Sequence, residues 1–181
     1  SKGRNGLGVL YVFSGGNGAW EGDYSSADSA TSSRGAITVC ATDAAGERAP
    51  YSERGSNLTV CAPSGRSTTP ATAPEITTTS VKDKYTDDFG GTSASAPMVS
   101  GVAALMLQAN PRLTWRDVPL ILARTARQVD VSKGGWSELR SPLAGITGHD
   151  VLRYSHHYGF GLVDAEAATR LARSWQSVGG S

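Results

Sequence analysis

The sequence has few histidines and cysteines and no long apolar run. It holds three histidines and two cysteines in 181 residues. The longest uninterrupted apolar run, residues 102–107, is far shorter than the roughly 20 residues of a membrane-spanning helix. Cys40 and Cys61 alone cannot form a disulfide scaffold or a zinc site. These shortages exclude a membrane-spanning helix, a disulfide-rich module and a zinc module.

Charge is also scarce, and the two signs balance. Lys and Arg number 17 against 16 Asp and Glu, and charged residues make up 18% of the chain. This balance gives no electrostatic reason to expect nucleic acid or an anionic membrane as a partner. The chain is long enough for a single domain with a real core, and residues 1–4 lead into a strand-like run without a signal-peptide pattern.

Short apolar runs in the first half of the chain predict strands. Residues 8–13 (GVLYVF) are almost continuously apolar and stop at a glycine-rich turn, which is typical of a strand buried on both faces of a parallel sheet. Residues 36–41 and 58–62 predict two more strands. Residues 76–79, rich in β-branched side chains, predict a weaker fourth strand.

The second half of the chain predicts helices. Residues 95–107 are apolar or small on every side, which predicts a helix buried in the middle of the domain, with Pro97 in its first turn. We expect a second helix to begin with Thr114 as its N-cap, so that Pro119 at the fifth position distorts it. A last helix is expected from about Asp164. Strands followed by helices predict a layered α/β fold.

A serine stands where a glycine-led loop enters the buried helix, in residues 91–97 (GTSASAP). Backbone N–H groups at a helix N-terminus favour developing negative charge, which suits Ser93 as a nucleophile whose attack creates an oxyanion. The same pattern also fits a plain capping role for Ser93 or Ser95.

A second motif, residues 14–18 (SGGNG), places Asn17 on a turn at the end of a strand. A side-chain amide there can donate a hydrogen bond to an oxyanion, and Gly15 and Gly16 let the backbone approach a substrate. Such a segment alone is usually an ordinary turn. The two motifs together, in this order, are more specific.

These motifs, with residues 113–118 (LTWRDV) and 154–165 (YSHHYGFGLVDA), resemble the subtilisin-like serine proteases, most closely the kexin/furin branch. The resemblance extends from residue 6 to about residue 175. It implies an α/β fold with a parallel sheet and a buried central helix that carries the nucleophile. It also implies that Ser93 is acylated, that Asn17 belongs to the oxyanion hole, and that Gly15 and Gly16 bind substrate.

The resemblance also implies roles for three acidic residues. Asp28 falls where kexin-like enzymes hold an acid that recognises a basic substrate side chain, and Asp23 and Glu53 fall where that branch places calcium ligands. Carboxylates suit both a guanidinium and calcium. Ser29 and Ala30 replace the family's usual glycine and aromatic residue after the pocket acid, which leaves the shape of that pocket open.

The cysteines and histidines carry weaker expectations. Cys40 and Cys61 lie at matching points of two predicted strands, where they fit buried free thiols or, if the strands are neighbours, a bridge; we expect free thiols.

All three histidines, His149, His156 and His157, follow Ser93, whereas in subtilisin-type order the acid and the base both precede the serine. An α/β-hydrolase needs Gly-x-Ser-x-Gly, and residues 91–95 (GTSAS) lack the last glycine. We therefore expect the histidines to be structural.

Residues 1–181 are accordingly expected to be the C-terminal part of a subtilisin-like peptidase domain, without the upstream part that carries the Asp and His. The expected function is a secreted or secretory-pathway, calcium-dependent serine endopeptidase that cleaves after basic residues, represented by a chain inactive alone. Its expected partners are protein or peptide substrates and the missing N-terminal half or a pro-segment. Two alternatives stay open: a broad-specificity subtilisin-like protease, and a non-catalytic subtilisin-like binding or scaffolding module.

Overall fold

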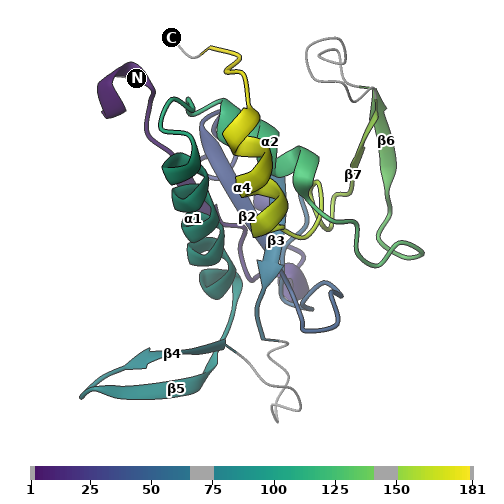
Figure 1. Ribbon diagram of the computed structural model, residues 1–181. Helices are drawn as coiled ribbons and strands as arrows, with labels where there is room; N and C mark the ends of the chain where they lie inside the picture. The colour runs from purple at the N-terminus through teal and green to yellow at the C-terminus, as the bar shows by residue number, and fades with distance from the viewer. Residues whose placement is uncertain (1–2, 66–75, 141–150, 180–181) are drawn as a thin grey trace.

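A three-stranded parallel sheet lies at the centre of the computed structural model, which describes residues 3–65, 76–140 and 151–179. Its strands are β1 (Tyr11–Ser14), β2 (Ala36–Thr42) and β3 (Leu58–Pro63), in the order β1-β2-β3. β2 is buried along nearly its whole length, as its continuous apolar run predicts. The predicted parallel sheet is confirmed, and among the described strands β1 forms one edge of it (Figure 1).

Three helices share a core with one face of this sheet: α1 (Thr92–Ala109), α2 (Asp117–Thr125) and α4 (Ala165–Ser174). Val39 and Val60 from the sheet pack with Val99 and Met106 of α1 in this core. α1 contacts all three strands and also α4. Short 3-10 turns η1 (Gly3–Gly6), η2 (Ala19–Glu21) and η3 (Ser25–Ala27) complete the first part of the chain. Within the described ranges, no helix combines the length and apolar character needed to cross a membrane.

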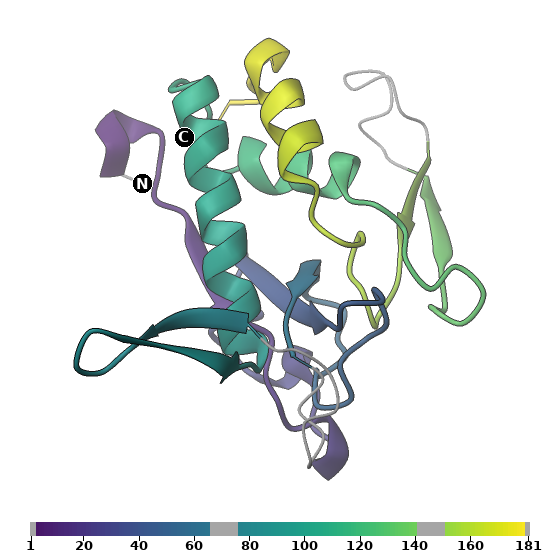
Figure 2. The same ribbon diagram turned by 60° about the horizontal axis from the view of Figure 1, so that its bottom comes forward.

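Two antiparallel hairpins lie outside the central sheet. β4 (Ile76–Ser80) pairs with β5 (Lys84–Phe89), and β6 (Ser137–Arg140) pairs with β7 (Val151–Tyr154). The predicted strand at 76–79 therefore exists, but it pairs with the residues that follow it rather than with the parallel sheet. The β4–β5 hairpin projects from the end of the molecule at which α1 begins (Figures 1 and 2).

The helix termini correct one expectation and confirm another. α2 begins at Asp117, so Pro119 lies in its first turn, where the missing N–H costs no intrahelical hydrogen bond; the expected distortion is wrong. Thr114 is not the N-cap; instead its N–H and Oγ1 donate to Asp117 Oδ2 over 2.6 and 2.8 Å. The last helix begins where it was expected, and Asp164 is its N-cap, its Oδ1 accepting from the N–H of Ala167 at 2.9 Å.

Cys40 and Cys61 form a disulfide, so the expectation of free thiols is wrong. The two residues are direct partners in the register between β2 and β3, and both side chains are fully buried. They belong to a second apolar cluster with Leu58, Tyr158 and Leu162. The bridge therefore joins the two strands that lie deepest in the molecule.

The two described histidines, His156 and His157, contribute backbone hydrogen bonds to the fold. The backbone carbonyl of His156 accepts from the N–H of Gly55 at 2.9 Å, and the backbone N–H of His157 donates to Ser155 Oγ at 3.0 Å. Neither forms a hydrogen bond or ion pair with Ser93 among the described residues. His149 lies outside the residues that the structure describes.

Candidate active site

Ser93 is the second residue of α1, and its side chain is exposed to solvent. No described residue hydrogen-bonds its hydroxyl, and α1 has no side-chain cap, so the capping alternative for Ser93 and Ser95 is wrong. Ser95 is buried and donates to the carbonyl of Ala62 at 2.9 Å, which ties the start of α1 to β3. Ser93 is thus the hydroxyl that the helix N-terminus presents to solvent.

Asn17 is held beside Ser93 through Thr92. Its Oδ1 accepts from the N–H of Thr92 at 2.9 Å and from Thr92 Oγ1 at 2.8 Å. The N–H of Gly16 donates to Thr92 Oγ1 at 3.3 Å. Because Oδ1 is committed as an acceptor, Nδ2 remains as the atom of Asn17 that can donate to a substrate oxygen.

Gly91 makes this close approach possible. Its φ of +78° lies in the left-handed region, and a Cβ there would stand 3.1 Å from Asn17 Nδ2. Its carbonyl accepts from Ser64 Oγ at 2.8 Å. The loop before Ser93 is therefore fixed from both sides, by Asn17 through Thr92 and by Ser64.

The site has the parts that stabilise an oxyanion. A carboxamide donor and the N-terminus of an 18-residue helix lie beside one exposed hydroxyl; in the first turn the N–H groups of Thr92 and Ala94 are already paired, with Asn17 Oδ1 and the Gly91 carbonyl. Negative charge that develops when a serine attacks a carbonyl is stabilised by such fixed donors. The sequence motifs located Ser93 and Asn17 but missed two residues that position them. Thr92 could have been found from its place between Gly91 and Ser93, whereas nothing in the sequence pointed to Ser64.

The two expected calcium ligands meet at one turn. Glu53 Oε1 accepts from the N–H of Gly18 at 2.9 Å, and the N–H of Asp23 donates to the carbonyl of Gly18 at 3.1 Å. A Cβ on Gly16, whose φ is +104°, would overlap the Glu53 carboxylate, so only glycine fits there. Among the described residues, no group of three or more His, Cys, Asp or Glu could hold a metal. Because calcium takes 6–8 oxygen ligands, Asp23 and Glu53 fit part of such a site and need further oxygens.

Asp28 organises its own turn. Its Oδ1 accepts from the N–H groups of Ala30 and Thr31 at 3.0 and 2.9 Å and from Thr31 Oγ1 at 3.1 Å. The hydrogen bonds from Thr31 lower the pKa of Asp28, so its exposed carboxylate is charged at neutral pH. No hydrogen bond or ion pair of the described residues links Asp28 to Ser93 or Asn17. The structure thus joins Asn17, Thr92, Gly16 and Glu53 by hydrogen bonds, with Ser93 next to Thr92 in the chain, and leaves Asp28 outside this network.

A parallel α/β sheet with an exposed serine at the start of its central helix, and a carboxamide fixed beside it, defines a serine-nucleophile hydrolase fold. Within that class the chain belongs to the subtilase family, whose sequence profile matches residues 1–161. The resemblance read from the motifs is confirmed.

Relatives of known name extend this assignment. The chain is 42% identical over 180 residues to proprotein convertase subtilisin/kexin type 6 of Rattus norvegicus, an alignment that covers 98% of this chain and 18% of the relative. It is 38% identical over 178 residues to protease KEX1 of Kluyveromyces lactis, covering 98% of this chain and 22% of the relative. The chain thus spans about a fifth of the length of the curated relatives it matches.

A solved structure agrees in fold. The serine protease of Aeromonas sobria superimposes with a TM-score of 0.79 at 24% identity, over 96% of this chain and 38% of that one. The subtilisin-like α/β fold is therefore confirmed.

Proposed function

We propose that this chain is the nucleophile-bearing part of a kexin-like serine endopeptidase. The arrangement of Asn17 and Thr92 beside the exposed Ser93 carries the proposal. Ser93 Oγ attacks the scissile carbonyl, and Asn17 Nδ2 with the N–H groups at the start of α1 receives the oxyanion. The proton of Ser93 needs a base held by an acid, and in the described part of the chain neither His156 nor His157 hydrogen-bonds to Ser93. The base and its acid come from a part of the domain outside this chain.

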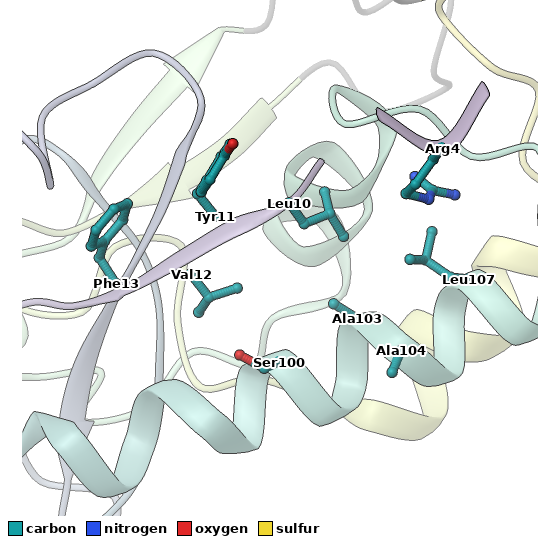
Figure 3. A pocket seen from close by; sticks show the side chains of 9 residues that line it. All are labelled: Arg4, Leu10, Tyr11, Val12, Phe13, Ser100, Ala103, Ala104 and Leu107. Atoms are coloured by element: carbon teal, nitrogen blue, oxygen red, sulfur yellow. The ribbon is translucent and has the colours of Figure 1, made fainter. Parts of the chain in front are cut away.

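An open apolar groove supports that division of the domain. Leu10, Val12, Ala103 and Leu107 face one another between β1 and α1 and line a hollow of about 590 Å³ (Figure 3). Residues 95–107 are apolar on every side, and such a helix is favoured only when it is covered all round. We place the part of the domain that carries the acid and the base against this face.

The proposal also covers the substrate specificity, the cofactor and the location of the enzyme. The proposed enzyme cleaves after basic residues of protein or peptide substrates, which Asp28 recognises, and calcium is held by Asp23 and Glu53 with other oxygens. The similarity to a proprotein convertase and a kexin-named protease supports this specificity. A secreted or secretory-pathway location is supported by the Cys40–Cys61 disulfide, because disulfides persist in oxidising compartments.

A fluorophosphonate probe tests the proposal, because it reacts only with a serine that a base activates. The 181-residue chain alone should remain unlabelled, and the longer protein that includes the upstream part should be labelled at Ser93. Ser93→Ala should abolish the label, while Ser100→Ala, on the same helix, should keep it. Labelling of the folded chain alone would show that this chain carries its own base. Failure of the longer protein to react would favour the non-catalytic module.

A further inference from the structure

A second cavity, of about 220 Å³, lies beside the turn that holds Asp23. Its lining residues are Ala19, Gly22, Asp23, Arg48, Arg54 and His157. Two arginines therefore line a cavity whose lining includes one carboxylate residue, Asp23. The reaction proposed above uses neither arginine.

Arg48 is fixed by its surroundings. Its backbone N–H donates to the hydroxyl oxygen of Tyr158 at 2.8 Å, and that hydroxyl donates to Asp130 Oδ2 at 3.1 Å. Its Nη1 donates to the carbonyl of Ser52. A guanidinium has five N–H donors, so Arg48 keeps others for a ligand.

Arg54 is held by Tyr24. Its Cζ lies 4.7 Å from the centroid of the Tyr24 ring, and its Nη2 donates to the Tyr24 hydroxyl. Its backbone carbonyl accepts from the N–H of Ser25 at 3.0 Å. Both arginines are therefore held in place before a ligand arrives, which lowers the entropy lost on binding.

Within the described part of the chain, no ion pair neutralises the positive charge of the cavity, because neither Arg48 nor Arg54 lies within ion-pair distance of a carboxylate there. Burial lowers the pKa of His157 most, and the charges of Arg48 and Arg54 lower it further. The positive charges of Arg48 and Arg54 thus both act on His157, which lines the same cavity. Asp23 opposes them with one negative charge.

We propose that this cavity binds a small oxyanion, a phosphate or a carboxylate group, between Arg48 and Arg54. Planar guanidinium forks recognise such groups through paired charge-assisted hydrogen bonds. At about 220 Å³ the cavity holds several waters, each of which takes about 30 Å³ in the liquid, so a phosphate group with hydrating water fits. Arg48 and Arg54 form no hydrogen bond with Ser93, Asn17 or Thr92 among the described residues, but the cavity shares Asp23 with the proposed calcium site.

Titration of the full 181-residue chain with inorganic phosphate or with acetate, at constant ionic strength and without calcium, tests the proposal. We expect saturable binding of one of the two in calorimetry; phosphate alone would assign a phosphate group, and acetate alone a carboxylate. Arg54→Gln should raise the Kd of that ion tenfold or more, and Arg54→Lys, which keeps the charge but loses the fork, should raise it less. Asp23→Asn should lower the Kd, because it removes the opposing carboxylate.

Arg153→Gln is the matched control, an exposed arginine paired with Glu138 at 3.4 Å on the β6–β7 hairpin, and it should leave the Kd unchanged. Circular dichroism verifies that each variant is folded; Arg48→Gln is a second variant among the residues that line the cavity. No saturable binding of either ion to the parent chain would overturn the proposal. Equal Kd values for the parent chain, folded Arg54→Gln and folded Arg48→Gln would also overturn it.

Discussion

Asn17 can serve catalysis only if its amide nitrogen, and not its carbonyl oxygen, faces the reacting group. Thr92 decides this, because both of its donors bind Asn17 Oδ1. The motif SGGNG alone cannot show that orientation. It depends on a contact between residues 75 positions apart, which only the folded chain provides.

Replacing Asn17 with Ala in the complete enzyme should lower kcat and leave KM nearly unchanged, since the side chain binds the oxyanion and not the ground-state carbonyl. The expected loss is about 10²–10³, a range taken from removal of the same kind of donor in subtilisin itself rather than obtained from this geometry. Steady-state kinetics on a peptide substrate measure both constants. An unchanged kcat would show that Asn17 acts only in the turn and does not stabilise the oxyanion.

Asp28 is expected to read the charge of the substrate. Asp28→Asn keeps the size and removes the charge, so kcat/KM should fall for substrates with Arg before the scissile bond and stay nearly constant for Leu or Ala there. The comparison of these kcat/KM values in the complete enzyme is the measurement. Because Asp28 Oδ1 also holds the turn with Thr31, an equal loss on both substrates would indicate a structural role and favour a broad-specificity protease.

The Glu53 carboxylate and the backbone N–H of Asp23 both hydrogen-bond to Gly18. The two carboxylates belong to one turn region, where they repel each other unless a cation lies between them. Calcium should therefore raise the Tm of the complete enzyme. The double substitution Asp23→Asn with Glu53→Gln should abolish that rise, whereas Glu21→Gln, exposed in the neighbouring turn, should retain it. Thermal unfolding with calcium and with a chelator measures the effect. An unchanged rise of Tm with calcium in the double variant would show that calcium binds elsewhere in the enzyme.

At the scale of elements, Asp117 joins the start of α2 to the segment after α4. Its side chain is fully buried. Trp175 Nε1 and the N–H of Val178 donate to its Oδ1, each at 2.9 Å, and Ser177 Oγ donates to its Oδ2 at 2.7 Å. Burial by itself would raise the pKa of Asp117, but the hydrogen bonds outweigh it, so the pKa lies below its ordinary value of 3.8.

Asp117→Ala should therefore lower the free energy of unfolding by about 3 kcal/mol or more, the upper value for one hydrogen bond to a charged group. Asp87→Ala, exposed in β5, is the matched control and should change it little. Since the folded pKa is depressed, the contribution of Asp117 is present above pH 3.8 and is lost as the pH falls through the folded pKa. Urea unfolding at pH 7 and below pH 4 should thus show a smaller difference between parent and variant in acid. An equal difference at both pH values would contradict this linkage.

The elements that the sequence predicted well depend on local patterns. The apolar runs of β1 to β3 and the start of α4 near Asp164 can be predicted from a few neighbouring residues. The failures depend on pairing between distant segments. Residues 76–79 carry the same β-branched signal whether they join a sheet or a hairpin, and the Cys40–Cys61 bridge requires the register of two strands. The residues Arg48 and Arg54 gave no sequence signal, because their shared cavity exists only in the fold.

At the scale of the whole molecule, one flank of the central helix is uncovered. The sequence predicts a helix buried on all sides, yet α1 faces a hollow beside β1, and Tyr11 of that strand is 57% exposed (Figure 3). A central helix that is apolar or small on every side is consistent with this structure if another layer covers the flank of α1 beside β1. It is inconsistent with the structure if the 181-residue chain is the whole folding unit, since an exposed strand edge of this kind favours pairing with a further strand.

This conflict can be tested by hydrogen exchange. Amides of β1 that do not pair with β2 should exchange rapidly in the 181-residue chain, because one side of the strand is open. In the longer protein a further strand and its helices would cover β1 and α1, and exchange of these amides should slow at least about tenfold, roughly 1.4 kcal/mol of added local stability. Amides of β6 and β7, at the opposite side of the molecule from β1 (Figure 1), should change little and serve as the internal control. Equal exchange of β1 in both proteins would place the missing part of the domain elsewhere, and with it the base that Ser93 needs.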